Sequence, residues 1–397
     1  MSRRGAFLTN ATSCDGANRD YWAVMVDDIC AALAAAGEDC RPVPFETAAV
    51  APACDAALKG MTPPDYLVLF NLLPDIRSPG GSIWHGAQVP LLVPCLDHPA
   101  HLAETLAALL ARWRAEPALP RRMVGVMEDA HRPFLAATGW PDDAVFTFAQ
   151  GGPPPLEQPL AIAERSEGAV FMGSVGAPVS DSDFFAAHRI GDRDVCRGMA
   201  AAVEETLAGN DDVMDVVVRH LAHRIADPGR LCLSIAVVDG RARTLRRFRL
   251  LQSLAGVPIT VFGRVDAEAA ARLPHCHPAG PLPFPDIVAR LEHTRVVVND
   301  TINLRGSALI RLYYALSRGC VVATELNGFI AAAFPPGRAI IPVGPGRPEG
   351  RAMLEAMLAG GGAAEDMAAA GRVAYAAGHT WQHRIGCLLQ AIGAAGP

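Results

Sequence analysis

The sequence predicts an α/β protein built from two Rossmann-like, doubly wound domains that face one another across a cleft. Short, nearly continuous apolar runs alternate with alanine-rich helical stretches from the first residues onward. This pattern is typical of parallel strands whose two faces are covered by helices. The alternation breaks at residues 150–155, where two glycines precede three prolines that fit neither a helix nor a central strand. A chain of 397 residues is long enough for two such domains.

The first domain is expected over residues 1–150. Gly37 should end its first helix, because glycine adopts the left-handed conformation that follows many helices without strain. The apolar runs predict strands at 7–9, 41–45, 66–71, 90–97 and 123–127, and the periodic stretches predict helices at 21–36 and 101–114.

The second domain is expected over residues 169–378, after a Pro/Gly-rich linker at 151–168. A helical region is expected at 183–255, and the chain beyond Glu355 is almost wholly helical in its pattern. The predicted strands are 169–174, 259–263, 295–299 and 320–324, and the predicted helices among them are 284–292 and 307–318.

Composition and missing motifs narrow the function. A net charge of −6 argues against nucleic-acid binding, which needs a basic face. The ten cysteines form no Cys-x-x-Cys pair and indicate a reduced, cytoplasmic protein. No apolar run approaches the length of a membrane helix. No Gly-x-Gly-x-x-Gly or Walker lysine loop follows a strand, so dinucleotide oxidoreductases and P-loop enzymes are disfavoured. The histidines at 220 and 223 and at 275 and 277 lack the spacing of a metal site, and we expect no metal.

The strongest candidate site is the segment 299–307, which joins a predicted strand to a predicted helix. Ligands of open parallel sheets bind outside the carboxyl ends of the strands. Ser307 suits a helix N-cap, Gly306 allows close approach of a ligand, and a helix N-terminus suits a diphosphate. Arg311 and Tyr314 follow Ser307 at helical spacing. The alternative is an ordinary capped helix with surface arginines.

Other strand ends carry weaker signals. Glycines follow two strands at Gly173-Ser174 and Gly263-Arg264, where a backbone could approach a phosphate. The basic run at 241–249 places Arg243 and Arg247 on one helix face, which either leans towards an anionic ligand or is simply solvated.

In the first domain, Asp97-His98 ends a strand and could supply a general base. The alternative is an aspartate that caps the next helix beside an exposed histidine. Four further polar residues lie at strand ends or in nearby loops, where they serve either a ligand or a turn: Asn10, Asp15, Asn71 and His85.

The order of motifs in the second domain resembles that of the GT-B glycosyltransferases, in particular the group related to the spore protein CgeB. The resemblance covers roughly 230 residues. The matching pieces are residues 170–174, 243–254, 261–263, 280–284, 298–299, Arg311 with Gly319, and the His-Thr-aromatic-x-His-Arg motif at 379–384.

The resemblance implies transfer of a sugar from a nucleotide-diphosphate donor, held by the second domain, to a hydroxyl of a glycan or protein acceptor, held by the first. It implies no metal, no cofactor besides the donor, and a C-terminal helix at 379–397 that crosses back to the first domain. The residues then assigned to the donor are Gly173, Ser174, Gly263, Arg264, Asn299, Arg305, Gly306, Ser307, Arg311, Tyr314, Glu325 and Asn327, and those assigned to the acceptor are Asn10, Asp15, Asn71 and His85.

One position departs from the family. Many relatives carry a glutamate that accepts hydrogen bonds from both ribose hydroxyls, where this sequence has Tyr314. A phenol lacks the charged, two-point contact of a carboxylate. Glu325, close to Asn327, is a possible substitute, and a shifted donor preference or loss of catalysis are the alternatives.

The mechanistic hypothesis is direct transfer with His98 as base and Asp97 orienting it, while Arg305, Arg311 and the helix start hold the departing diphosphate. Two other functions stay open at this point. One is a non-catalytic scaffold or sensor that binds sugar nucleotides, and the other is a sugar-nucleotide epimerase that needs no acceptor.

Overall fold

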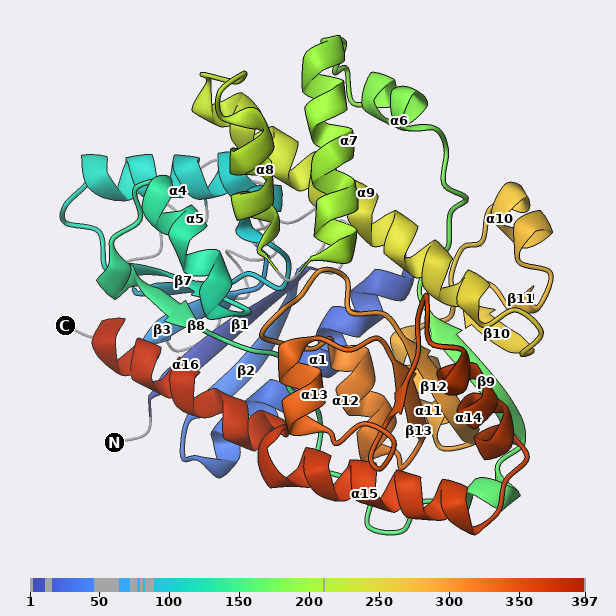
Figure 1. Ribbon diagram of the computed structural model, residues 1–397. Helices are drawn as coiled ribbons and strands as arrows, with labels where there is room; N and C mark the ends of the chain where they lie inside the picture. The colour runs from blue at the N-terminus through green and yellow to red at the C-terminus, as the bar shows by residue number, and fades with distance from the viewer. Residues whose placement is uncertain are drawn as a thin grey trace. The chain divides into compact units, whose positions relative to one another are not determined.

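The computed structural model describes residues 3–10, 16–45, 64–71, 77–78, 81–82, 89–209 and 211–395. These residues form two compact units (Figure 1). The first contains the described residues within 1–152, 283–285 and 379–397, and the second contains those within 153–282 and 286–378. The predicted α/β class, with a parallel sheet in each half, is confirmed.

The first unit contains a parallel sheet of six strands in the order β2-β1-β3-β6-β7-β8. The strands are β1 (Arg4–Asn10), β2 (Asp39–Phe45), β3 (Tyr66–Leu69), β6 (Leu91–Pro94), β7 (Arg122–Val126) and β8 (Val145–Thr147), and a separate hairpin pairs β4 (Arg77–Ser78) with β5 (Gly81–Ser82). The helices are α1 (Gly16–Ala35), α4 (Ala103–Ala115), α5 (Arg132–Ala137) and α16 (Trp381–Ala395).

Helix α1 packs against the sheet through an apolar stripe that is visible in its sequence. Met25, Ile29 and Leu33 recur every four residues and are fully buried, which is the stripe an amphipathic helix lays on a sheet. Gly37 follows the helix with a φ of 92°, as predicted. Figure 1 shows α16, at the red end of the chain, among the blue elements of this unit, and α16 contacts α1, β7 and β8.

The second unit contains a parallel sheet in the order β11-β10-β9-β12-β13-β14. The strands are β9 (Glu167–Met172), β10 (Ile259–Phe262), β11 (Cys276–Pro278), β12 (Thr294–Asn299), β13 (Val321–Thr324) and β14 (Ile341–Pro342). The helices are α6 (Asp181–Ala187), α7 (Arg193–Ala208), α8 (Val213–Leu221), α9 (Pro228–Ser253), α10 (Ala267–Arg272), α11 (Phe284–Leu291), α12 (Ile310–Ser317), α13 (Gly328–Ala333), α14 (Pro348–Leu358) and α15 (Gly362–Gly378).

This strand order places a topological switch point between β9 and β12. Numbered within the unit, the order is 3-2-1-4-5-6, the arrangement of dinucleotide-binding Rossmann sheets. Connections leave β9 and β12 in opposite directions across the sheet, so the loops after these two strands diverge and leave room between them. A ligand of the second unit is therefore expected where β9 and β12 end.

Residues 153–166, which precede β9, are part of the second unit. Arg165 is buried, and its guanidinium donates to the carbonyls of Thr294 at 2.8 Å and Arg318 at 2.9 Å. Further along, Arg372 of α15 donates to the Leu156 carbonyl, and the Tyr375 hydroxyl donates to the Pro153 carbonyl. These contacts fix the entry of the chain into β9.

Several elements differ from the expectation. The region 183–255 consists of helix α6 through α9, and the helical tail divides into α14, α15 and α16. Strands β8, β11 and β14 were not predicted. Each has only two or three residues, and β11 and β14 end in proline, so they lack the apolar length that marks a strand in sequence. Among the described residues, no helix is long and apolar enough to cross a bilayer.

Two glycines allow the ends of β9 and β10 to approach closely. A Cβ on Gly263 would overlap the carbonyl of Gly173, and Gly173 itself has a φ of 151°. We expect Gly263→Ala to destabilise the second unit by about 1–3 kcal/mol, because backbone atoms would have to move. The measurement is the free energy of unfolding in urea. Gly240→Ala is the control, since nothing lies within 4 Å of its added methyl in α9, and alanine should stabilise that helix by up to about 1 kcal/mol. Equal stability of Gly263→Ala and wild type would contradict the close approach.

Candidate functional site

A buried ion triad occupies the switch point of the second unit. Asp300, the residue after β12, is fully buried. Arg247 of α9 contacts its Oδ2 through Nε at 3.0 Å, and Arg311 of α12 contacts its Oδ1 through Nη2. Two guanidiniums share one carboxylate, so the triad carries a net charge of +1.

The same guanidiniums fix the backbone at the end of β9. Arg311 donates through Nη1 to the Met172 carbonyl, and Arg247 donates through Nη1 to the Ser174 carbonyl at 2.6 Å. The two acceptors flank Gly173. Both guanidiniums also lie over the Phe171 ring, with Cζ to ring-centre distances of 5.6 and 5.7 Å. The triad therefore joins the ends of β9 and β12 through α9 and α12.

Gly173 leaves this position without a side chain. An added Cβ there would lie 3.0 Å from Arg311 Nη1, so a larger residue would crowd the cation. Next to it, the Ser174 hydroxyl accepts the Arg264 backbone N–H at 3.3 Å, and the Gly173 N–H donates to the Phe262 carbonyl. The predicted residues Gly173, Ser174, Gly263 and Arg264 are thus brought together beside the triad.

The electrostatics of the triad favour the ionised carboxylate. Burial raises the pKa of Asp300, but the two guanidiniums outweigh it and lower the pKa to about 2. The site therefore stays a fixed array of charges at any pH near neutrality.

Every arginine of the basic run has a carboxylate partner in the second unit. The pairs are Arg241–Asp181, Arg243–Asp239, Arg246–Glu325, Arg247–Asp300 and Arg249–Glu204. The solvated-face interpretation is wrong for the first four, whose side chains are mostly buried. The local sequence pattern could not show these carboxylate partners, because each of them lies on another helical turn or on another element.

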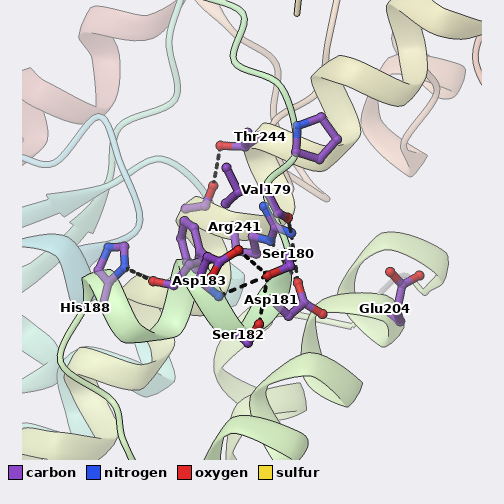
Figure 2. A network of polar contacts seen from close by, with 12 residues as sticks. Val179, Ser180, Asp181, Ser182, Asp183, His188, Glu204, Arg241 and Thr244 are labelled. Atoms are coloured by element: carbon purple, nitrogen blue, oxygen red, sulfur yellow. Dashed lines mark hydrogen bonds and ion pairs between the residues drawn. The ribbon is translucent and has the colours of Figure 1, made fainter. Parts of the chain in front are cut away.

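Arg241 illustrates the structural part of this run (Figure 2). Its Nη2 donates to the Val179 carbonyl at 2.6 Å, and its guanidinium contacts Asp181 and lies 5.0 Å from the centre of the Phe184 ring. Ser180 caps α6 by accepting the Asp183 N–H. Arg241 therefore anchors the start of α6 to α9.

The loop after β12 is held in an unusual conformation. Ile302 and Asn303 have φ values of 47° and 76°, and a β-branched residue in the left-handed region is strained. Asn303 accepts from Arg246 Nε at 3.1 Å and donates to Asp239 Oδ1 at 2.7 Å. Arg305 donates to the carbonyls of Asp211 and Thr206. Contacts to α9, to the last turn of α7 and to Asp211 beyond it thus hold the loop that begins at Asp300.

The predicted N-cap at Ser307 is wrong. Helix α12 begins at Ile310, and its N-cap is Leu309, which makes no side-chain capping bond. Ser307 is buried, and its carbonyl accepts a hydrogen bond from Asn327 Nδ2 at 2.8 Å. Asn327 also holds the Leu304 carbonyl and caps α13 through the Ile330 N–H. These bonds keep residues 304–309 out of the helix, so Ser307 does not share a helix face with the residues after it.

The other residues assigned to the donor differ in their exposure. Gly306 is exposed in the same loop. Asn299 is buried and donates to Thr324 Oγ1 at 3.0 Å, which joins β12 to β13. Tyr314 is fully buried and presents no surface to a ligand. Glu325, after β13, is 8% exposed, and its Oε1 lies 3.6 Å from Arg246 Nη1. Burial raises the pKa of Glu325 to about 7 against the opposing pull of Arg246.

In the first unit, Asp97 contacts Asn71. Asn71 has a φ of 51°, donates through Nδ2 to Asp97 Oδ2 at 3.1 Å, and accepts the Leu96 N–H at 2.6 Å. It therefore links the ends of β3 and β6. Asn10 is the last residue of β1, and its side chain lies outside the described part of the structure, as do the whole residues Asp15 and His85.

His98 is a capping residue in this structure. It is 3% exposed, and its Nδ1 accepts the Ala100 N–H at 3.1 Å at the start of a short 3₁₀ turn. A backbone N–H can only donate, so a neutral His98 carries its proton on Nε2. Nδ1 is therefore an acceptor in this structure. The alternative of an exposed histidine is wrong, because the side chain is buried.

A buried pair that was not predicted lies beside His98. Glu128 and His131 follow β7, and Glu128 Oε1 lies 3.3 Å from His131 Nε2. The His131 and His98 rings meet edge to face, 4.6 Å apart. Glu128 comes just after a predicted strand, so the strand-end rule applied to residues 123–127 would have found it.

The two histidine groups rejected as metal sites have protein partners. His220 Nε2 lies 2.6 Å from Glu205 Oε2, and His275 Nε2 lies 2.9 Å from the Leu251 carbonyl. The C-terminal motif is structural in the first unit: Trp381 stacks on Phe148, and Arg384 contacts His379 Nδ1 at 2.7 Å. Burial, together with Arg384 and His383, lowers the pKa of His379 to about 4.

Part of the chain, which includes this site, matches a known protein family. Residues 243–390, just over a third of the chain, match the family model described as glycosyl transferase-like. That segment contains all three members of the triad. No curated protein sequence matches the chain.

Solved structures match over the whole length. An alpha-glucosyltransferase in complex with UDP-glucose and DNA containing an abasic site superposes with a TM-score of 0.56 at 8% identity, covering 100% of both chains. The alpha-glucosyltransferase AGT in complex with UDP gives 0.55 at 9% identity, covering 99% of this chain and 100% of that one. Anabaena HepE in complex with UDP and glucose gives 0.48 at 10% identity, covering 98% and 99%. The chain has the fold of the GT-B glycosyltransferases.

We expect Asp300→Asn to destabilise the protein by about 3 kcal/mol, because it leaves two buried guanidiniums without their carboxylate. The pH dependence gives a second readout. Since the folded pKa is about 2 and lies below the ordinary value, the carboxylate of the wild type stabilises the fold above about pH 4, and this contribution is lost as the pH falls towards 2. Urea unfolding from pH 7 to pH 3 measures both effects. Asp194→Asn, at an exposed helical pair, is the control and should change stability by less than about 0.5 kcal/mol. Matching stabilities of the two variants would contradict the triad.

Proposed function

We propose that the protein is a glycosyltransferase that moves a sugar from a nucleotide-diphosphate-sugar donor to a hydroxyl of a glycan or protein. The observation that carries the proposal is the Arg247–Asp300–Arg311 triad around Gly173. It sits where β9 and β12 end, within a segment that matches a glycosyl transferase-like family model.

The triad suits a diphosphate for three physical reasons. Its net charge of +1 attracts an anion, its guanidiniums are already held in place, and Gly173 adds no side chain beside them. Donors that are fixed before the reaction stabilise charge that develops in the transition state, and they do so best where water is excluded. The charge that develops here is that of the departing diphosphate. In this proposal Arg247 and Arg311 stabilise it without a metal ion.

Arg305 has an indirect role in this proposal, through the loop between β12 and α12. Its guanidinium is bonded to two carbonyls, so it acts by holding the loop between β12 and α12 and not by a direct phosphate contact. Arg311, on the first turn of α12, is the better candidate for the phosphate.

The acceptor side remains a proposal based on His98. Because Nδ1 receives the Ala100 N–H, it is the atom with a lone pair, and it can take the acceptor proton only after that capping bond breaks. The buried Glu128–His131 pair adjoins the His98 ring, since the two histidine rings meet edge to face. Direct transfer with such a base would invert the configuration of the sugar.

Nucleoside diphosphates should raise the melting temperature of the protein in EDTA, since a ligand that binds only the folded state stabilises it by mass action. We expect a shift with at least one of UDP, GDP, ADP and dTDP. Arg311→Ala should weaken that binding at least about tenfold, because a charge-assisted contact is lost. Arg311→Lys, which keeps a charge near Asp300, is the second variant in case the first does not fold.

Arg197→Ala is the matched control, because Arg197 is an exposed arginine on α7, and it should leave the shift unchanged. No shift with any of the four nucleotides would overturn the proposal. A shift that survives in both Arg311 variants would place the phosphate elsewhere. Release of the diphosphate from the corresponding sugar nucleotide, when acceptors are added, then tests transfer itself.

A further inference from the structure

A groove of about 530 Å³ lies between α14 and α15 in the second unit. Its floor is formed by methionines at the edge of the core. Met357 and Met367 are 7% and 5% exposed, and Met353 packs beside them. Methionine is flexible and polarisable, so it adapts its shape to an apolar group that packs against it. The groove therefore offers an apolar floor to a partner.

This groove lies away from the triad. Gly337 and Arg338, which line the groove, precede β14, whereas the triad lies where β9 and β12 end. The strands of this sheet are parallel, so their beginnings and their ends lie at opposite edges of the sheet. A partner in the groove therefore need not contact the triad.

Two exposed side chains of opposite charge line the groove. Arg338 comes from the loop before β14, and Asp366 comes from α15. Within the part of the chain that the structure describes, neither side chain makes a hydrogen bond or an ion pair. One cation and one anion at the same groove are complementary to a partner that presents the same two charges.

Helix α15 also carries an apolar side chain that projects into solvent. Val373 is 69% exposed, more than any other large apolar side chain among the described residues. It follows Asp366 by two helical turns, so both lie on the same face of α15. This face thus combines a projecting apolar group, an apolar groove and charges of both signs. A two-fold interface requires such self-complementarity, because the same surface is used by both copies.

We propose that the protein forms a two-fold symmetric dimer through this groove, in which α15 packs antiparallel to α15 of a second copy. Ala370, which lines the groove, would lie at the two-fold axis, where its small side chain lets the helices approach closely. Each residue before Ala370 then faces the residue equally far after it in the other copy. Val373 of each copy therefore faces Met367 of the other and packs on the methionine floor.

The same arrangement pairs the charges. Asp366 of one copy faces Ala374 of the other. Arg338 lies beside this part of α15, because a Cβ added to Gly371 would lie only 2.8 Å from the carbonyl oxygen of its neighbour Ala339. Arg338 of each copy is thus placed to contact Asp366 of the other, and two-fold symmetry makes the contact twice.

Sedimentation velocity over a range of micromolar concentrations tests this dimer, and we expect the wild type to dimerise. Arg338→Glu and Asp366→Arg each place like charges opposite one another at both contacts, so each should weaken the dimer at least about tenfold. The double variant exchanges the two charges and should dimerise again. Arg197→Glu, at an exposed arginine of α7, is the control and should dimerise as the wild type does.

An equimolar mixture of the two single variants gives the sharpest readout. Each copy of one variant is complementary to a copy of the other, so the mixture should form a heterodimer although neither variant dimerises alone. Such a heterodimer also shows that both variants fold. Val373→Ser should weaken the wild-type dimer as well, because it removes the apolar contact without a change of charge.

Four results would overturn the proposal. They are a wild type that stays monomeric, assemblies that grow beyond a dimer, a dimer that survives both charge reversals, and reversals that neither the double variant nor the mixture rescues. Because the triad takes no part in this interface, none of these results bears on the proposed function.

Discussion

The burial of Asp300 is the constraint on which the second unit depends. A fully buried carboxylate is tolerable only when cations and hydrogen bonds offset its lost hydration, and Arg247 and Arg311 supply both. Satisfying Asp300 also brings α9 and α12 to the same strand end, because each contributes one guanidinium. Those guanidiniums then hold the two carbonyls that flank Gly173. One buried charge thus sets the geometry of the whole switch point, and its two cations leave the site with a net positive charge.

Further hydrogen bonds and ion pairs hold the residues around the triad in place. Asn303 and Asn327 fix the strained loop between β12 and α12, the first through Arg246 and Asp239 and the second through the carbonyls of Leu304 and Ser307. Arg246 continues the network to Glu325. Two adjacent residues of α9 thus contact the carboxylates that follow β12 and β13.

The fold could be predicted because strands and helices each leave a pattern of apolar residues in the local sequence. Buried parallel strands are continuous apolar runs, and α1 carries its stripe at four-residue spacing. Short edge strands such as β11 and β14 carry too few residues for such a pattern. The site was harder. Gly173 and Gly263 were predicted from their places at strand ends, and Arg311 from its helical spacing after Ser307. The carboxylate partner of Arg247 lies 53 residues away, so sequence could not show that the basic run is buried. Ser307 has the chemistry of a cap, yet Asn327 holds its carbonyl outside the helix. His98 likewise has the chemistry of a base but is engaged in a cap.

The most direct test of the central claim is a crystal structure of the protein with a bound nucleoside diphosphate. The account predicts phosphate oxygens within hydrogen-bond distance of the Arg247 or Arg311 guanidinium and beside the Gly173 backbone, with Asp300 still shared by both arginines. Phosphates bound elsewhere, with the triad unchanged and closed to them, would contradict it.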